Sequence, residues 1–136
     1  MKLLNIGSAV ALTLMAGGAA AACPGTPITG VAITSLLTGN TVCVGTAGNW
    51  EAQELHVSGG NLVDFKRGPG HPVDPSETVG SWSVNAAANT VSHNYGAGGT
   101  YTYTISPNGG AGYSFCSTAG APEILATVKA GGGGCP

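Results

Sequence analysis

The sequence is poor in charged residues: it has four Lys or Arg and six Asp or Glu among 136 residues. A nucleic-acid binder needs a positive surface that displaces counterions from phosphates, and a chain with a formal net charge of −2 does not supply one. The same shortage of positive charge removes an electrostatic attraction to anionic membranes. Because 43% of the residues are hydrophobic, the chain is also unlike a disordered, charge-rich segment. We therefore expect a folded domain without a nucleic-acid partner.

Several catalytic and metal-binding motifs are missing. No cysteines have CxxC or CxxCH spacing, which removes the basis for zinc-ribbon, thioredoxin-like and c-type haem sites. No GxSxG nucleophile elbow occurs. Glu51 and Glu54 would point to opposite faces of a strand, and Ser92 and His93 are neighbours in sequence, so neither pair predicts catalysis. We predict a protein that is not an enzyme and has no cofactor, in which His93 is an ordinary strand residue.

The N-terminal residues 1–22 have the three parts of a secretory signal. Lys2 supplies the positive charge, the apolar run that follows is too short to span a bilayer permanently, and small residues end at Ala22. Cleavage near Ala22 would leave Cys23 first and one domain, residues 23–136, with no stable membrane span. The expected location is secreted or periplasmic. A lipoprotein acylated at Cys23 stays open as an alternative, although Ala20 fits its motif poorly and acylation would leave three cysteines.

Four cysteines in an oxidising compartment predict two disulfides. They occur at Cys23, Cys43, Cys116 and Cys135, and three connectivities are open. The sequence favours Cys23 with Cys43 and Cys116 with Cys135, since each pair would tie a loose terminal segment to a nearby strand. Each of these bridges would close a loop of about 20 residues and would stabilise the fold by roughly 3 kcal/mol.

Hydrophobic periodicity predicts an all-β fold with one short N-terminal helix. The helix is expected over residues 28–37, with Thr29 as its cap and Gly39 after its end. Residues 68–78 contain three prolines and are expected to form the longest loop. An antiparallel up-and-down meander of about eight strands favours a closed barrel over a sandwich. The expected strands are residues 41–44, 50–57, 62–67, 79–85, 90–95, 100–106, 112–116 and 124–129.

Residues 81–116 form the core of this meander, with aromatic and aliphatic residues at every second position. The tyrosine face of its strands is expected to lie inside the barrel or half-buried, where it either packs the core or lines a ligand cavity. One segment also permits a different interpretation. Residues 100–105, TYTYTI, carry no charge and no proline and would favour self-association if they were exposed.

Some of these elements also occur together in a known kind of protein. The pattern LLTGNT at residues 36–41, Trp50, GSWSV at residues 80–84 and YSFC at residues 113–116 resembles small secreted four-cysteine bacterial β proteins. The GSW element and the strand count are also faintly similar to avidin and lipocalin barrels, although a lipocalin GxW lies near the first strand and this one lies mid-chain. Both resemblances imply at most a secreted β-barrel binder, and no binding residue carries over from either.

Charge and histidine concentrate between Glu51 and Glu77, which holds five of the six acidic residues. A hairpin through Gly59 and Gly60 would bring Glu54 or His56 close to Asp64 or Lys66. This face is either solvated and structurally neutral, or a ligand site, or a metal site that uses His56, Asp64, His71 and Asp74. Of the two kinds of site, we prefer the ligand site without a metal, and its candidate residues are Trp50, Glu54, His56, Asp64, Arg67, His71 and Asp74.

Together these patterns predict a small secreted or periplasmic, non-catalytic β-barrel binding module. Its partner would be an unidentified small molecule or protein. The alternative is a self-associating extracellular or matrix protein of the fibre type, motivated by residues 100–105.

Overall fold

The structure is a computed structural model that describes residues 23–65 and 76–136. The predicted signal, residues 1–22, and the proline-rich residues 66–75 lie outside the described part. Within the described residues the chain forms α1 (Gly30–Leu37), a short 3-10 turn (Gly96–Gly98) and eight strands. The strands are β1 (Thr41–Thr46), β2 (Asn49–His56), β3 (Asn61–Asp64), β4 (Glu77–Asn85), β5 (Thr90–Asn94), β6 (Thr100–Pro107), β7 (Gly112–Ser117) and β8 (Ile124–Lys129).

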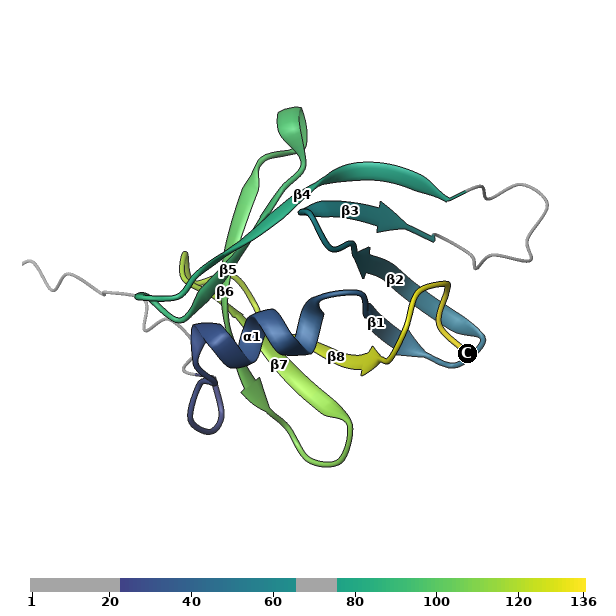
Figure 1. The fold of residues 1–136 in the computed structure, drawn as a ribbon. Coiled ribbons are helices and arrows are strands. Elements are labelled where there is room, and N and C mark those ends of the chain that lie inside the picture. The colour runs from purple at the N-terminus through teal and green to yellow at the C-terminus, as the bar shows by residue number, and fades with distance from the viewer. Residues whose placement is uncertain (1–22, 66–75) are drawn as a thin grey trace, which may run out of the picture.

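The eight strands form a closed antiparallel barrel in chain order, with β1 paired to β8 (Figure 1). The predicted all-β barrel with a short helix is therefore confirmed. Hairpins need positive φ angles that glycine adopts without strain, and Gly59 and Gly60 supply φ angles of 104° and 100° between β2 and β3. The end of the predicted proline-rich loop differs from the prediction: Glu77 and Thr78 belong to β4 and not to the loop, because strand pairing resumes after the last proline.

The helix α1 packs at the end of the barrel where β4 turns into β5. Thr29 caps it by accepting a hydrogen bond from the backbone N–H of Ala32 at 3.3 Å. Ile33 and Leu37 are fully buried in the barrel core. Gly30 lies so close to the β4–β5 turn that a Cβ atom there would be 2.5 Å from the Cα of Ala86, which explains why the first helical residue lacks a side chain. The helix therefore covers one end of the barrel and leaves the other to the site described below.

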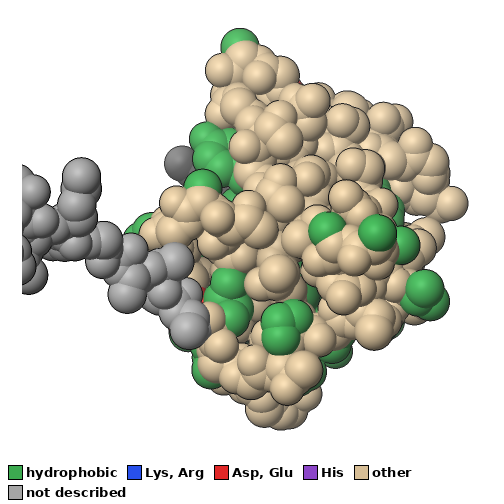
Figure 2. All heavy atoms as spheres, turned by 90° about the vertical axis from the view of Figure 1, so that its left-hand side faces the viewer, with side chains coloured by type: hydrophobic (Ala, Val, Ile, Leu, Met, Phe, Trp, Pro, Cys, Tyr) green, Lys and Arg blue, Asp and Glu red, His purple; other side chains and the backbone are tan. Residues whose placement is uncertain are grey.

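Strand alternation divides the side chains between the barrel interior and the outer surface. The interior is largely apolar, with Leu62, Val91, Ile105 and Phe115 buried in one core cluster. Tyr103 and Tyr113 pack against it half-buried, as predicted for the tyrosine face, whereas Tyr101 is 48% exposed. Among the described atoms on the face in Figure 2, no charged side chain is visible and small hydrophobic patches are scattered. Charge is therefore not spread evenly over this molecule.

The two disulfides join Cys23 to Cys116 and Cys43 to Cys135, so the favoured pairing of sequence neighbours is wrong. The reason is barrel closure. The N-terminal segment runs beside β6, where the N–H of Ile28 donates to the carbonyl of Ile105 at 2.8 Å. The C-terminal segment folds over the outside of β1 and β2. Each bridge therefore ties a segment near one end of residues 23–136 to a strand more than ninety residues away.

Candidate functional site

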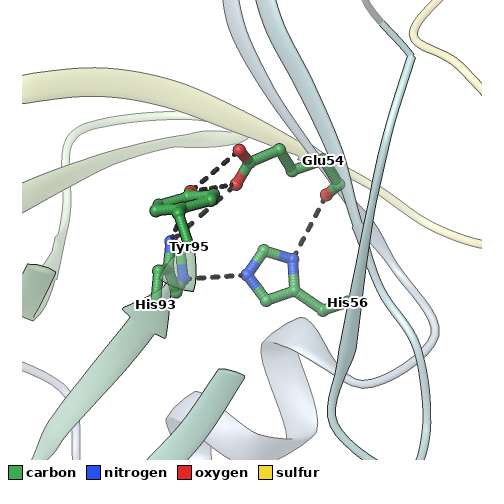
Figure 3. A network of polar contacts seen from close by, with 4 residues as sticks. All are labelled: Glu54, His56, His93 and Tyr95. Carbon is green, nitrogen blue, oxygen red and sulfur yellow. Dashed lines mark hydrogen bonds and ion pairs between the residues drawn. The ribbon is translucent and has the colours of Figure 1, made fainter. Parts of the chain in front are cut away.

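A cluster of polar side chains lies inside the otherwise apolar barrel. Glu54 and His56 alternate on β2, and His93 and Tyr95 alternate at the end of β5. These two strands are not neighbours in the sheet, so the four side chains meet across the barrel interior (Figure 3). Because residues i and i+2 of a strand share a face, each strand delivers two polar groups to the same side.

The cluster is held by short contacts. The Nε2 atoms of His56 and His93 are 3.0 Å apart, and Nδ1 of His56 lies 3.2 Å from the backbone carbonyl oxygen of Glu54. The Tyr95 hydroxyl lies 2.8 Å from each carboxylate oxygen of Glu54 and 3.4 Å from Nδ1 of His93. His93 Nδ1 and Glu54 Oε2 are 3.8 Å apart. The contacts therefore form one chain from His56 to the Glu54 carboxylate.

These contacts assign the imidazole tautomers. A carbonyl oxygen can only accept, so Nδ1 of His56 carries the hydrogen and its Nε2 is an acceptor. His93 must then donate from Nε2, which leaves a lone pair on its Nδ1. The single hydroxyl hydrogen of Tyr95 is directed to the Glu54 carboxylate. That hydroxyl also lies 3.4 Å from Nδ1 of His93, but its one hydrogen is directed to Glu54, so Nδ1 of His93 keeps a lone pair that can accept.

Burial keeps both imidazoles neutral. His56 is fully buried and His93 is 5% exposed. Loss of hydration lowers the pKa of His56 to about 3, assisted by the neighbouring His93, and lowers the pKa of His93 to about 4. His56 also packs edge-on against Trp82, with ring centroids 5.2 Å apart, and the indole N–H of Trp82 donates to the carbonyl of Val57 at 3.0 Å. The pair is thus fixed by packing as well as by hydrogen bonds.

Glu54 is the acidic group of the cluster. Burial raises its pKa, the Tyr95 hydroxyl partly opposes this, and the negative charge of Asp64 raises it further. The pKa of Tyr95 is raised as well, mainly by burial and then by the adjacent Glu54 charge. Asp64 pairs with Glu54 in the β2–β3 register, so its carboxylate belongs to the same interior face. Two carboxyl groups therefore lie on one interior face of the barrel.

A cavity of about 110 Å³ adjoins this cluster. Glu54, His93 and Tyr95 contribute its polar lining, and the rest of its wall is aliphatic and aromatic: Val42, Val44, Ala52, Tyr103, Phe115 and Ile124. The Glu54 side chain is 19% exposed, so solvent reaches the polar end. The cavity lies away from α1, towards the turns that join β1 to β2 and β7 to β8.

The structure brings together some of the predicted site residues and separates others. Glu54 and His56 lie in the cluster and Asp64 lies beside it, so the interpretation of this strand face as a solvated surface is wrong for Glu54 and His56. The reason is that barrel closure turns this face inward. Trp50 lies elsewhere: its indole N–H donates to the carbonyl of the C-terminal Pro136 at 3.0 Å. The remaining predicted residues are outside the described part of the chain: Arg67, His71 and Asp74.

Sequence reasoning missed two members of the cluster. His93 lies in strand β5, as expected, but the sequence reasoning did not predict that its ring would be buried and hydrogen-bonded to His56. Tyr95 was expected only as an apolar strand position. The alternation of Val91, His93 and Tyr95 was the available signal, because it places a histidine on the same face as a core valine.

Ser92 and His93 point to opposite faces of β5. The Ser92 hydroxyl lies 2.7 Å from that of Thr102 on the neighbouring strand, whereas His93 points to the interior. Glu51 is exposed and Glu54 is interior, as strand alternation predicts. Among the described residues, the atoms grouped closely enough for a metal are the sulfurs of Cys23 and Cys116 with the Glu123 carboxylate. Both sulfurs are in a disulfide, so this group is not a ligand set.

Within residues 23–65 and 76–136, no helix has the length and apolar character needed to cross a membrane.

The sequence and the structure were compared with known proteins. No family model matches the sequence, and neither the curated proteins nor the solved structures contain a significant match.

Proposed function

We propose that this protein is a secreted or periplasmic, non-catalytic binding module that takes a small molecule, or the head of a larger one, into the barrel cavity beside Glu54. The cavity volume of about 110 Å³ limits the occupant. It corresponds to roughly four water molecules at ~30 Å³ each, well below the ~300 Å³ of the smallest drug-sized pockets. The part of the ligand that enters is therefore a compact group.

The observation that carries this proposal is the buried polar cluster at the cavity wall. Burying a carboxylate and two imidazoles costs free energy that an apolar core of the same volume would not. Nine buried apolar residues of the described part form the core cluster of the barrel, and the side chains of His56, His93 and Glu54 hydrogen-bond to one another or to Tyr95. Buried polar side chains that cost stability, next to a cavity that solvent reaches, are typical of a binding site.

We favour binding over catalysis because the titratable groups beside the cavity are hydrogen-bonded to one another: Glu54 to Tyr95, and His93 to His56. The described cavity wall also has no serine, cysteine or lysine nucleophile, and the described cysteines are all in disulfides. The location is supported by those disulfides, which persist in oxidising compartments. It is supported as well by the secretory pattern of residues 1–22.

The self-association alternative loses its motivating feature in this fold. Strand β6, which contains the TYTYTI segment, is paired to β5 on one side and to β7 on the other. A strand paired on both sides offers no free edge to another chain. We therefore propose the binding module alone.

The test is an NMR titration of the oxidised protein with three probes of matched size: n-butylammonium, n-butanol and n-butyrate. We expect at least one probe to shift the amide signals of residues that line the cavity. Ala52→Leu should abolish the shifts, because the added side chain would fill the cavity, and Val44→Leu serves the same purpose. Ala88→Leu, on an exposed turn at the helix end, is the matched control. If none of the three probes shifts cavity residues, the proposed function is wrong.

A further inference from the structure

The polar end of the cavity presents hydrogen-bond acceptors. Glu54 offers two carboxylate oxygens, and His93 offers the lone pair of Nδ1. The Tyr95 hydroxyl has one hydrogen and uses it on Glu54. A ligand that supplied only acceptors would leave all these lone pairs unmatched, so the ligand's entering group should be a donor with more than one hydrogen.

The distances fit one nitrogen that serves two acceptors. Glu54 Oε2 and His93 Nδ1 are 3.8 Å apart, too far for a direct hydrogen bond. A nitrogen about 2.9 Å from each atom could bridge them, since the N–H bonds of an ammonium group diverge. A hydroxyl group, with its single hydrogen, could satisfy only one of the two.

The electrostatic field at this point favours a positive charge. Asp64 lies next to Glu54 in the sheet register, and its charge makes ionisation of Glu54 harder. Lys129 is the one Lys or Arg among the described residues, and it donates to the carbonyl of Gly132 at 2.9 Å. A cation in the cavity would be attracted by the Glu54 carboxylate.

The walls suit a cation as well. Tyr95, Tyr103 and Phe115 line the cavity, and Tyr103 and Phe115 pack edge-on with ring centroids 6.1 Å apart. Aromatic faces attract ammonium groups through their quadrupole. The aliphatic wall of Val42, Val44 and Ile124 would contact the carbon atoms next to the nitrogen.

We propose that the ligand of this site is a protonated amine, whose ammonium nitrogen bridges the Glu54 carboxylate and Nδ1 of His93. This inference rests on the proposed function, because it names the chemical class that the same cavity binds. His56 is a positioning residue: by accepting from Nε2–H of His93, it holds the His93 tautomer that turns a lone pair towards the ligand.

The test compares affinities of the same three butyl probes at pH 7, in the oxidised protein and two variants of equal net charge. n-Butylammonium should bind at least about tenfold more tightly than n-butanol or n-butyrate, the factor expected of one charge-assisted hydrogen bond. Glu54→Gln should weaken n-butylammonium by about tenfold or more while changing n-butanol little. Glu51→Gln, which removes the same charge from the exposed face of the same strand, should change neither affinity.

The outcomes separate this inference from the function on which it rests. If n-butanol or n-butyrate binds in the cavity as tightly as n-butylammonium, the site exists and the amine assignment is wrong. Equal weakening by Glu54→Gln and Glu51→Gln would show a general effect of net charge and would also overturn the assignment. The comparison of the three probes in the unmodified protein decides the matter even if Glu54→Gln fails to fold. Absence of binding by all three overturns both proposals.

Discussion

Acid should destabilise this barrel through two buried imidazoles. His56 and His93 have pKa values of about 3 and about 4 in the folded protein, against 6.5 for an exposed histidine. In the unfolded chain both imidazoles gain a proton as the pH falls through 6.5, whereas in the folded chain they stay neutral until much lower pH. Their contribution to stability is therefore complete above pH 6.5 and declines as the pH falls towards 4.

The magnitude follows from the two pKa values. Between pH 7.5 and pH 4.5, each histidine binds a proton in the unfolded chain but largely not in the folded one over nearly two pH units. At ~1.4 kcal/mol per unit, this lowers the free energy of unfolding by roughly 3 kcal/mol for each histidine. Glu54 acts in the opposite direction, because its pKa is raised in the folded state and its protonation favours folding in acid. The net loss is still a large share of the ~5 to 15 kcal/mol that stabilises a typical domain.

Urea unfolding followed by tryptophan fluorescence measures this loss, since Trp82 is buried against His56. The free energy of unfolding should fall steeply between pH 7 and pH 4.5 in the unmodified protein. In His93→Gln that fall should be about half as large, because one of the two titrating groups is gone. An identical pH dependence in the protein and the variant would refute the account of the buried neutral pair.

Three further predictions concern the scaffold. Gly80→Ala should lower the free energy of unfolding by roughly 1 to 3 kcal/mol, because the added Cβ would lie 2.2 Å from the carbonyl oxygen of Asn94. The control Ser81→Ala, at an exposed neighbouring position, should change this free energy by less than about 0.5 kcal/mol. Equal urea midpoints for the two variants would contradict this prediction. Replacing Cys43 and Cys135 together by serine should cost about 4 to 5 kcal/mol for a bridge that spans 92 residues, and an unchanged melting temperature would argue against it. Proteolytic mapping of the oxidised protein should recover Cys43 linked to Cys135, and a peptide that links two N-terminal cysteines would contradict the fold.

Local signals in the sequence were sufficient for the secondary structure. Thr29 and Gly39 mark the ends of α1, and glycine-rich turns separate runs that alternate with period two. The predicted strands differ from the observed ones by a few residues at their ends, most at β3, which stops at Asp64. Up-and-down order follows because short turns can join only antiparallel neighbours.

Contacts made by closing the barrel were beyond local signals. The pairing of β1 with β8 places Cys43 beside the C-terminal segment, and no spacing between cysteines encodes this. The same holds for the polar cluster: Glu54 and His93 are 39 positions apart on strands that do not pair, and they meet only because the sheet curves around an interior. Alternation shows which residues share a face but not that the face is enclosed.

The most direct test of the amine site is a long-range 1H–15N NMR spectrum of the histidine side chains at pH 7, recorded with and without n-butylammonium. The account predicts neutral rings, with the hydrogen on Nδ1 of His56 and on Nε2 of His93, and a shift of the His93 Nδ1 signal as it accepts a hydrogen bond from the amine. The His56 tautomer should not change. A hydrogen on Nδ1 of His93, or a His93 signal that does not respond while n-butylammonium binds, would contradict the central claim.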